Sequence, residues 1–518
     1  MAKRVLIIGG GTAGWLTAGY LARRLGADLP DGASIRLIQS REIGTLGVGE
    51  GTFPTIRRTL ETIGIDEAEM VRRCGATFKQ GAKFIDWQNA PGTASGPDHY
   101  LHGFQVAESP GGLELLPYWL LGAAGDQPWD EASTPQKKAA DANRAPKLAT
   151  HPSFAGPLNY AFHFDAVTLA EMLRDQAIAN GVEHIVDTVT EVMLDCEGAI
   201  EAVRTQSGQL HDADLYIDCT GFRAELIGKA LGVPFRSCRD VLFCDRAIAI
   251  QVPYTQPRNP IASYTISTAK ESGWIWDIGL DARRGIGHVY SSGHMDDDRA
   301  EEILRDYIGP VGAELETRTF KFEAGYREIN WRKNCVAIGL SSGFFEPLEA
   351  TGIIFCEVAA SLVANLFPWG GDYETSARQF NAIMLRRYER TLDFIKLHYC
   401  ISERRDTQFW RDNVDIGSIP DRLLELLERW RFRPPTEIDA DPLDLFTQES
   451  WQYVLYGMGW KTDLSAKAGI YRYFDEAKAA FAEVKRQAQF AIANLPTNRD
   501  LVEYARTHAF GPEGAVAA

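Results

Sequence analysis

The 518-residue sequence lacks several patterns that would identify a protein at first sight. Its eight cysteines are scattered, with no Cys-x-x-Cys pair and no cysteine–histidine grouping at zinc-site spacing. No stretch reaches the roughly 18 uninterrupted apolar residues of a membrane span. Acidic residues exceed basic ones by 70 to 54, which disfavours nucleic acid or an anionic membrane as a partner. We therefore expect the cysteines to be free thiols and the protein to have no metal site.

The N-terminal residues resemble a secretory leader only superficially. An apolar run, Val5–Ile8, follows Lys3 and Arg4, but three glycines interrupt it. Arg23 and Arg24 then stand where a cleavage region belongs. We expect a cytoplasmic protein in which this run forms a strand.

The first forty residues predict a βαβ unit, with a strand at 4–8, a helix at 15–25 and a strand at 34–39. Further strands are expected as a pair within 184–205, at 215–218 and at 335–338. One nucleotide-binding domain would therefore be assembled from distant parts of the chain. Beyond residue 371 the pattern is helical, at 375–399, 421–431 and 476–494.

A glycine-rich loop joins the first strand to the first helix. Gly9, Gly11 and Gly14 fit the G-x-G-x-x-G pattern in the context where such a loop binds a pyrophosphate. Gly9 permits the tight turn, Gly11 lets the backbone approach the phosphates, and Gly14 lets helix and strand pack closely. The helix N-terminus adds N–H groups and a positive dipole. The alternative is a glycine-rich turn in an α/β protein that binds no nucleotide.

The cofactor expected in this loop is FAD rather than NAD. Two further glycine-bearing strand ends, at 218–221 and 339–343, lie far downstream, as an extended FAD requires. Gln39 occupies the place of the acidic residue that usually binds the ribose, and its amide oxygen accepts a hydrogen bond without charge. Binding should therefore be weaker, although Glu42 could substitute. We predict contacts to FAD at Gly9, Gly11, Thr12, Ala13, Gly14, Gln39, Ser40, Gly49, Gly339 and Leu340.

Several other segments resemble the tryptophan-halogenase family of flavin-dependent halogenases. They are GVGEGTFP at 47–54, FKQGAKFIDW at 78–87, YAFHFD at 160–165, CTGF at 219–222 and FEPLEATGI at 345–353. The family's W-x-W-x-I-P motif is present as Trp274–Gly279, with glycine in place of the proline. Gly279 frees a backbone that proline would stiffen. The resemblance extends from the N-terminus to about residue 365.

The resemblance implies an α/β fold with a Rossmann-like FAD-binding domain of the flavin-monooxygenase type. We place this domain at 1–365, with insertions at about 80–160 and 245–330 that form a layer covering the substrate. The helical C-terminal region, 366–518, would complete the substrate site.

The implied reaction uses FADH2, oxygen and chloride or bromide to make hypohalous acid, which halogenates an aromatic, indole-like substrate. The family's active-site lysine corresponds to Lys79 and its carboxylate to Glu349, while Glu346 should be structural. A plainer interpretation makes Lys79 a surface lysine whose stem covers Phe78 and Phe84. Lys83 is the second candidate for the active lysine.

The resemblance also implies contacts to the halide and the substrate. The halide would bind at Thr351 and Gly352, and the substrate at His102, Phe104, Trp274 and Trp276. Each has an ordinary alternative: a helix N-terminus, a histidine in an exposed loop, and tryptophans packed on one face of a core strand. The family's C-terminal tyrosines and glutamate have no clear counterpart, so the substrate need not be free tryptophan.

A separate NAD(P)H-dependent flavin reductase would supply the FADH2, and a homodimer is compatible with the sequence. Two other functions stay open. One is a single-component flavin monooxygenase that hydroxylates an aromatic substrate. The other is a catalytically silent flavoprotein.

Overall fold

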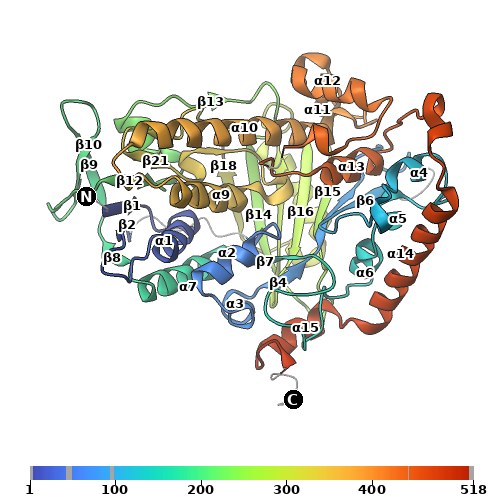
Figure 1. Cartoon of the computed structure of the whole chain (residues 1–518), viewed down its shortest axis with the longest axis horizontal. Coiled ribbons are helices and arrows are strands. Elements are labelled where there is room, and N and C mark those ends of the chain that lie inside the picture. The colour runs from blue at the N-terminus through green and yellow to red at the C-terminus, as the bar shows by residue number, and fades with distance from the viewer. Residues whose placement is uncertain (1–3, 42–48, 94–97, 442, 513–518) are drawn as a thin grey trace. The chain divides into compact units, whose positions relative to one another are not determined.

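The computed structural model describes residues 4–41, 49–93, 98–441 and 443–512 (Figure 1). The chain divides into two compact units, each assembled from three stretches. The first unit comprises 1–76, 164–238 and 323–388, and the second comprises 77–163, 239–322 and 389–518. Most of the two predicted insertions falls in the second unit, whereas residues 366–388 belong to the first. The predicted domain limits themselves stay a prediction.

The first unit is built on a six-stranded sheet in the order β20-β21-β12-β1-β2-β8. These strands are β20 (Trp331–Arg332), β21 (Cys335–Ala337), β12 (Leu215–Asp218), β1 (Arg4–Ile8), β2 (Ser34–Gln39) and β8 (Glu183–Val186). All neighbours are parallel except β20 and β21. The central strands are apolar because both faces of a parallel sheet are covered.

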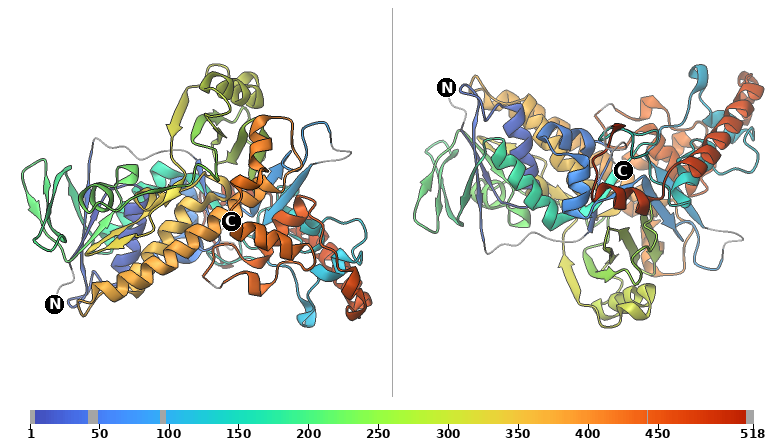
Figure 2. Two further views of the ribbon diagram at one scale, coloured as in Figure 1. Left: turned by 90° about the horizontal axis from the view of Figure 1, so that it is seen from above. Right: turned by 90° about the horizontal axis from the view of Figure 1, so that it is seen from below.

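Both faces of this sheet have their own covering elements. Helix α1 (Thr12–Arg24) packs against both α7 (Ala166–Ala179) and α9 (Thr351–Asn365). Leu6 and Ile8 of β1 instead join a core cluster that includes residues of β10 (Ile200–Thr205) and the helical turn Glu225–Ala230. β10 lies between β9 (Val189–Leu194) and β11 (Leu210–His211), and the β9–β10 hairpin forms an outer edge of this unit (Figure 2). This is the predicted α/β class.

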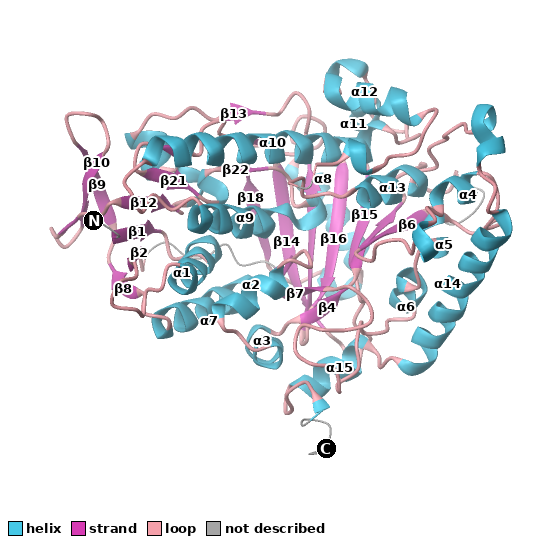
Figure 3. Ribbon diagram, viewed as in Figure 1, coloured by secondary structure: helices cyan, strands magenta, loops and turns pink. Residues whose placement is uncertain are grey.

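The second unit contains a seven-stranded, mainly antiparallel sheet in the order β18-β14-β17-β16-β15-β5-β6. Figure 3 labels β18, β14, β16, β15 and β6 of this sheet. The strands are β18 (Thr317–Lys321), β14 (Arg246–Pro253), β17 (Arg283–Tyr290), β16 (Gly273–Gly279), β15 (Thr265–Lys270), β5 (Gly81–Ile85) and β6 (His99–Gly103). Helix α8 (Asp297–Ile308) covers one face, where Ile275 of β16 packs with Ile303 and Leu304. A separate ladder pairs β4 (Thr77–Lys79) with β7 (Ala161–Asp165).

The remaining helices are mostly in the C-terminal part of the chain. They are α2 (Ile56–Ile63), α3 (Glu67–Cys74), α4 (Leu116–Leu120), α5 (Trp129–Ala132), α6 (Gln136–Asp141), α10 (Tyr373–Cys400), α11 (Gln408–Asn413), α12 (Asp421–Trp430), α13 (Gln448–Gly457), α14 (Phe474–Asn494) and α15 (Asn498–Ala505). Observed helix limits lie within a few residues of the predicted ones. The largest difference is α1, which begins at Thr12 and not at Trp15.

One stretch of the described residues has the length and apolar character of a membrane span. It is Leu348–Asn365, with a mean hydropathy of 1.4, and 61% of it is buried within the protein. Its main part is α9, which packs against α1. Burial of this kind is typical of the core helix of a globular protein.

Candidate active site

The glycine loop Gly9–Gly14 connects β1 to α1, and its glycines have different surroundings. Gly9 has a φ of +115°, and a Cβ there would overlap the carbonyl of Cys219 at the end of β12. A Cβ on Gly14 would overlap the carbonyl of Gly9. Around Gly11, in contrast, no atom lies within 4 Å of where a Cβ would stand. Two glycines are therefore needed for packing inside the protein, and the third leaves an open approach at the start of α1.

Other predicted cofactor residues lie at the same edge of the sheet, because β1, β2, β12 and β21 are parallel and end together. Gly339, just after β21, has a φ of +77°, and a Cβ on it would lie 2.8 Å from the Cβ of Ala13. The distant strand end thus reaches the phosphate loop. Thr12, Ala13 and Leu340 are half-buried.

Gln39 is held by an internal contact at this edge. Its Oε1 accepts a hydrogen bond from Nε1 of Trp15 at 3.3 Å, and its stem fills the place where a Cβ of Gly10 would stand. The Gln39 amide oxygen, which we expect to accept a hydrogen bond from a ribose hydroxyl, thus already accepts one from Trp15. Ser40 pairs its hydroxyl with that of Thr188 at 2.8 Å.

The GVGEGTFP segment at 47–54 is described only from Gly49 onward. Glu42, Gly47 and Val48 lie outside the described residues, and Gly49 begins β3 (Gly49–Gly51). Burial, and secondarily the charge of Asp165, raises the pKa of Glu50 to about 7. No role was predicted for Glu50, although it stands in the GVGEGTFP segment.

The turn that contains Glu349 has an unusual backbone. Glu349 and Ala350 are consecutive non-glycine residues with φ of +64° and +53°, a conformation that costs free energy for residues with a side chain. The Glu349 side chain is 7% exposed, and Glu346 is fully buried. Helix α9 begins directly after this turn at Thr351. No atom lies within 4 Å of a Cβ placed on Gly352, so the first turn of α9 is open to a small anion there.

A buried carboxyl group further along α9 was not predicted as a functional residue. Glu357 accepts hydrogen bonds from the hydroxyls of Thr59 at 2.6 Å and Thr55 at 3.4 Å. Burial nevertheless raises its pKa to about 8, so the group is mostly protonated at neutral pH. Cys356 beside it also has a raised pKa, caused mainly by burial, and its sulfur would lie 3.5 Å from a Cβ on Gly339.

Lys79, in the second unit, is not a surface lysine. It ends β4 and is 2% exposed, which contradicts the plainer interpretation. Phe78 faces the other side of β4, where it contacts the rings of Tyr160 and Phe162. The Lys79 ammonium nitrogen is 5.3 Å from the centre of the Phe104 ring, within cation–π range.

Lys83 has a different environment. Its Nζ makes an ion pair of 2.7 Å with Asp141, whose carboxylate also pairs with Lys137. These contacts lower the pKa of Asp141, although burial alone would raise it. Lys83 is therefore committed to an ion-pair cluster.

His102 and Phe104 lie at the end of β6 and directly after it. The interpretation of His102 as an exposed-loop histidine is wrong, because it is 2% exposed within the strand. Its ring lies against Phe394, Phe446 and Tyr453, at centroid distances of 5.7–6.4 Å. The Phe104 amide donates to the carbonyl of Gln80, the residue after Lys79, at 3.1 Å. Main-chain pairing thus holds Phe104 next to the lysine.

The tryptophans of the W-x-W-x-I motif share the face of β16 opposite α8. Trp274 is 1% and Trp276 is 7% exposed, and their ring centroids are 6.4 Å apart. A Cβ on Gly279 would lie 3.0 Å from both Ile261 and the Tyr254 hydroxyl. The Gly279 carbonyl accepts a hydrogen bond of 2.6 Å from Thr77, at the start of β4. The glycine therefore makes room for Tyr254 and connects this motif to the strand that ends in Lys79.

Two tyrosines of α13, Tyr453 and Tyr456, make hydrogen bonds inside the protein. The Tyr453 hydroxyl donates to the carbonyl of Gln105 at 2.9 Å, and the Tyr456 hydroxyl pairs with Thr462 at 3.0 Å. Burial raises the pKa of Tyr453 to about 12. Both hydroxyls are thus engaged inside the protein.

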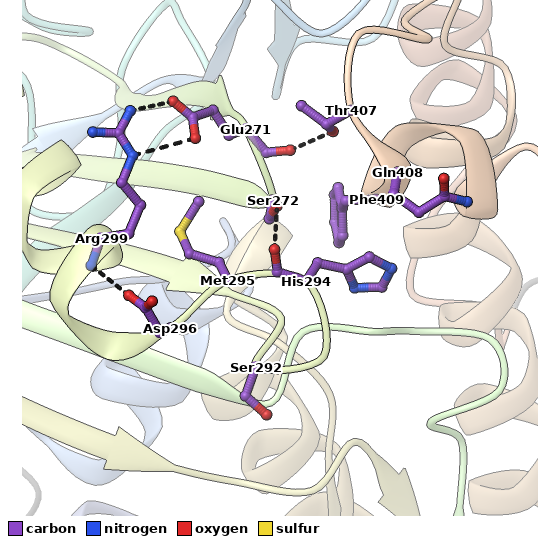
Figure 4. A pocket seen from close by; sticks show the side chains of 10 residues that line it. All are labelled: Glu271, Ser272, Ser292, His294, Met295, Asp296, Arg299, Thr407, Gln408 and Phe409. Carbon is purple, nitrogen blue, oxygen red and sulfur yellow. Dashed lines mark hydrogen bonds and ion pairs between the residues drawn. The ribbon is translucent and has the colours of Figure 1, made fainter.

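An open cleft of about 520 Å³ in the second unit contains none of the predicted site residues (Figure 4). It lies at the turn between β15 and β16, beside the start of α8. Glu271 and Arg299 form an ion pair across its rim, and the Thr407 hydroxyl donates to the Glu271 carbonyl. The lining is Glu271, Ser272, Ser292, His294, Met295, Asp296, Arg299, Thr407, Gln408 and Phe409. The cleft does not coincide with the surroundings of Lys79.

Similarity to known proteins extends over almost the whole chain. The family described as tryptophan halogenase matches residues 4–469. Tryptophan 6-halogenase SttH from Streptomyces toxytricini is 36% identical over 517 residues, covering 95% of this chain and 96% of the relative. The structure of a tryptophan halogenase from Shewanella frigidimarina has a TM-score of 0.93 at 38% identity, with 99% of each chain covered. BrvH, a flavin-dependent halogenase from Brevundimonas sp., has a TM-score of 0.87 at 32% identity, covering 98% of this chain and 99% of its own.

Proposed function

Because this chain belongs to the tryptophan halogenase family and is a flavin-dependent halogenase, we propose that Lys79 directs hypohalous acid onto an indole-like aromatic substrate. The observation that carries this assignment is the burial of Lys79 beside Phe104. A lysine shielded from water can present its charge to a small reactive molecule without competition from bulk solvent.

The residues of the first unit fit FAD. The open approach at Gly11, the packing of Gly9 and Gly14, and the position of Gly339 against Ala13 form a cradle at the start of α1. Bound reduced FAD supplies, with oxygen, the oxidising power that converts a halide ion into hypohalous acid. We propose that the halide binds at Thr351 and Gly352, where the open first turn of α9 offers N–H groups.

The Lys79 ammonium donates a hydrogen bond to the oxygen of the hypohalous acid and makes the halogen more electrophilic. Phe104 covers one side of the ammonium with its ring face. We assign to Glu349 the removal of the proton from the ring carbon after the halogen has added. The left-handed backbone at this residue costs free energy, and we propose that this cost serves to hold the carboxylate in place.

The proposed substrate is an aromatic molecule bound near His102 and Phe104, with Trp274 and Trp276 as further substrate contacts. Since the hydroxyls of Tyr453 and Tyr456 are engaged internally, they are poorly placed to bind an amino-acid end. We therefore propose indole-like substrates that are not restricted to free tryptophan. A separate flavin reductase would supply FADH2.

The test is a product assay with purified protein, FAD, NADH, a flavin reductase, bromide and a panel of indoles and phenols, analysed by mass spectrometry. We expect a brominated product that is lost in Lys79→Ala and retained in Lys83→Ala, the matched control. A double-mutant cycle of Lys79→Ala and Glu349→Gln should show strong non-additivity if both act in one step. Hydroxylation without the reductase would indicate a monooxygenase. Bound flavin without any product across the panel would point to a silent flavoprotein.

A further inference from the structure

The β4–β7 ladder places a histidine on the same face as Lys79. In this antiparallel pair Lys79 is opposite Ala161, and Thr77 is opposite His163. Directly opposed residues share a face, as do residues two apart on one strand. His163 is thus the diagonal neighbour of Lys79, and the small side chain of Ala161 leaves space between them.

The imidazole of His163 is fully buried and held at one end. Its Nε2 is 2.8 Å from the hydroxyl of Thr265 on β15. Its Nδ1 has no hydrogen-bond partner among the described residues, although it is buried. Burial, and then the positive charge of Lys79, holds the pKa of His163 well below its usual value. The ring is therefore neutral at physiological pH, with one N–H and one lone pair.

A second histidine of the same unit shows which part of this arrangement is special. His288 is also fully buried, with Nδ1 2.9 Å from the carbonyl of Ala300 and no hydrogen-bond partner for Nε2 among the described residues. Burial lowers its pKa to about 4. An unpartnered ring nitrogen is thus not by itself a sign of function. What distinguishes His163 is its place on the face of β7 next to the active lysine.

We propose that His163 is a positioning residue for Lys79: with Nε2–H donated to Thr265, its Nδ1 lone pair accepts one N–H of the lysine when hypohalous acid is bound. This inference rests on the proposed function of Lys79. An ammonium has three N–H donors, so one can be held by the imidazole while another contacts the hypohalous acid.

A neutral acceptor suits this task better than a charged one. A carboxylate at this place would pair with the ammonium and reduce its effect on the halogen, and a protonated imidazole would repel it. A neutral imidazole fixes the direction of the ammonium and leaves its full charge for the hypohalous acid. No covalent bond to His163 forms or breaks.

Two substitutions separate the roles of the two ring nitrogens. His163→Gln keeps a polar group near Nε2, for Thr265, and removes the Nδ1 acceptor. His163→Asn keeps a group near Nδ1 and removes the contact to Thr265. The matched control is His288→Asn, which keeps the bonded nitrogen of that ring and removes the unpartnered one.

The readout is the fate of the hypohalous acid under the product assay, with a dissolved 1,3-diketone as a trap for acid that escapes. For His163→Gln we expect about a tenfold lower kcat for aromatic halogenation, an unchanged KM and a matching rise in trapped halogen, since one charge-assisted hydrogen bond is lost. His163→Asn should keep most of the coupling, which is the fraction of hypohalous acid that ends in the halogenated aromatic product. His288→Asn should have the same coupling as the wild type. The assignment would be overturned if His163→Gln had the same coupling as the wild type. It would also be overturned if the coupling were poorer in His163→Asn than in His163→Gln.

Lys79→Ala in the same assay separates the two hypotheses. If it still halogenates, the proposed function fails; if it is inactive while His163→Gln behaves as wild type, only the role of His163 fails. A measurement on the wild-type protein tests the proposal even if the variants do not fold. In protein labelled with ¹⁵N-histidine, the His163 Nδ1 resonance should be that of an unprotonated nitrogen at neutral pH. A protonated Nδ1 at neutral pH would refute the proposal.

Discussion

Glu357 should make the stability of this protein depend on pH, because its carboxyl group is buried in α9. Its pKa rises from 4.5 to about 8 on folding. When an acid has a higher pKa in the folded protein than in the unfolded chain, its protonated form favours folding. This contribution to stability is complete below the pKa of the unfolded chain, and it is lost as the pH rises to the pKa of the folded protein. The loss therefore takes place between about pH 4.5 and pH 8.

The magnitude follows from the gap between the two pKa values. Each pH unit between the two pKa values changes the free energy of unfolding by about 1.4 kcal/mol. The free energy of unfolding therefore falls by about 3 kcal/mol between pH 4 and pH 7, and by about 5 kcal/mol by pH 9. Glu357→Gln cannot ionise, yet its amide oxygen can still accept from Thr59 and Thr55. We expect the variant to match the wild type near pH 5 and to exceed its stability by several kcal/mol near pH 8.5.

The assay is urea unfolding of the flavin-free protein, followed by tryptophan fluorescence at several values between pH 5 and pH 8.5. The control is Glu425→Gln on α12, whose side chain is 74% exposed and should show no such trend. A stability difference for Glu357→Gln that is the same at every pH would refute the reasoning. So would a variant less stable than the wild type at pH 8.5.

Three further predictions concern the cofactor loop and the second lysine. Gly14→Ala should destabilise the fold because its Cβ overlaps the Gly9 carbonyl, whereas Gly11→Ala should fold normally and bind FAD at least tenfold more weakly. Thermal unfolding measures the first effect and flavin fluorescence the second. Two variants with the same stability and the same FAD affinity would contradict the geometry. Gln39→Glu keeps an acceptor for Trp15 and adds a charge, so FAD should bind a few-fold tighter by equilibrium dialysis, while unchanged affinity would place the ribose elsewhere. Lys83→Ala should cost about 1 kcal/mol in urea unfolding through its lost ion pair, and an inactive variant would reverse the ranking of the two lysines.

The parts of the fold that follow local rules could be predicted from the sequence. The glycine loop between an apolar run and a helix predicted β1, α1 and the parallel neighbour β2. The start of α1 was placed three residues late, because the helix begins inside the glycine motif at Thr12 and not at the first large apolar residue. The assembly of the first sheet from distant strands was expected because two later strand ends also carry glycines.

Features set by tertiary contacts could not be predicted. Nothing in the residue types of Glu349 and Ala350 signals a left-handed backbone, which glycine or asparagine usually adopts. The burial of His102 depends on rings contributed by α10 and α13, far along the chain. His163 was quoted within YAFHFD, but its relation to Lys79 depends on the β4–β7 register.

The raised thiol pKa values beside the phosphate loop have a consequence for the working life of the enzyme. Thiolates, far more than thiols, are attacked by oxidants such as hypohalous acid. With a pKa of about 12, roughly one Cys356 side chain in 10⁵ is a thiolate at pH 7. Cys219, at the end of β12, is half-buried, and desolvation raises its thiol pKa well above the usual value as well. The packing at the cofactor edge therefore keeps these two sulfur atoms mainly as thiols, the form that is less reactive toward the oxidant that the enzyme makes.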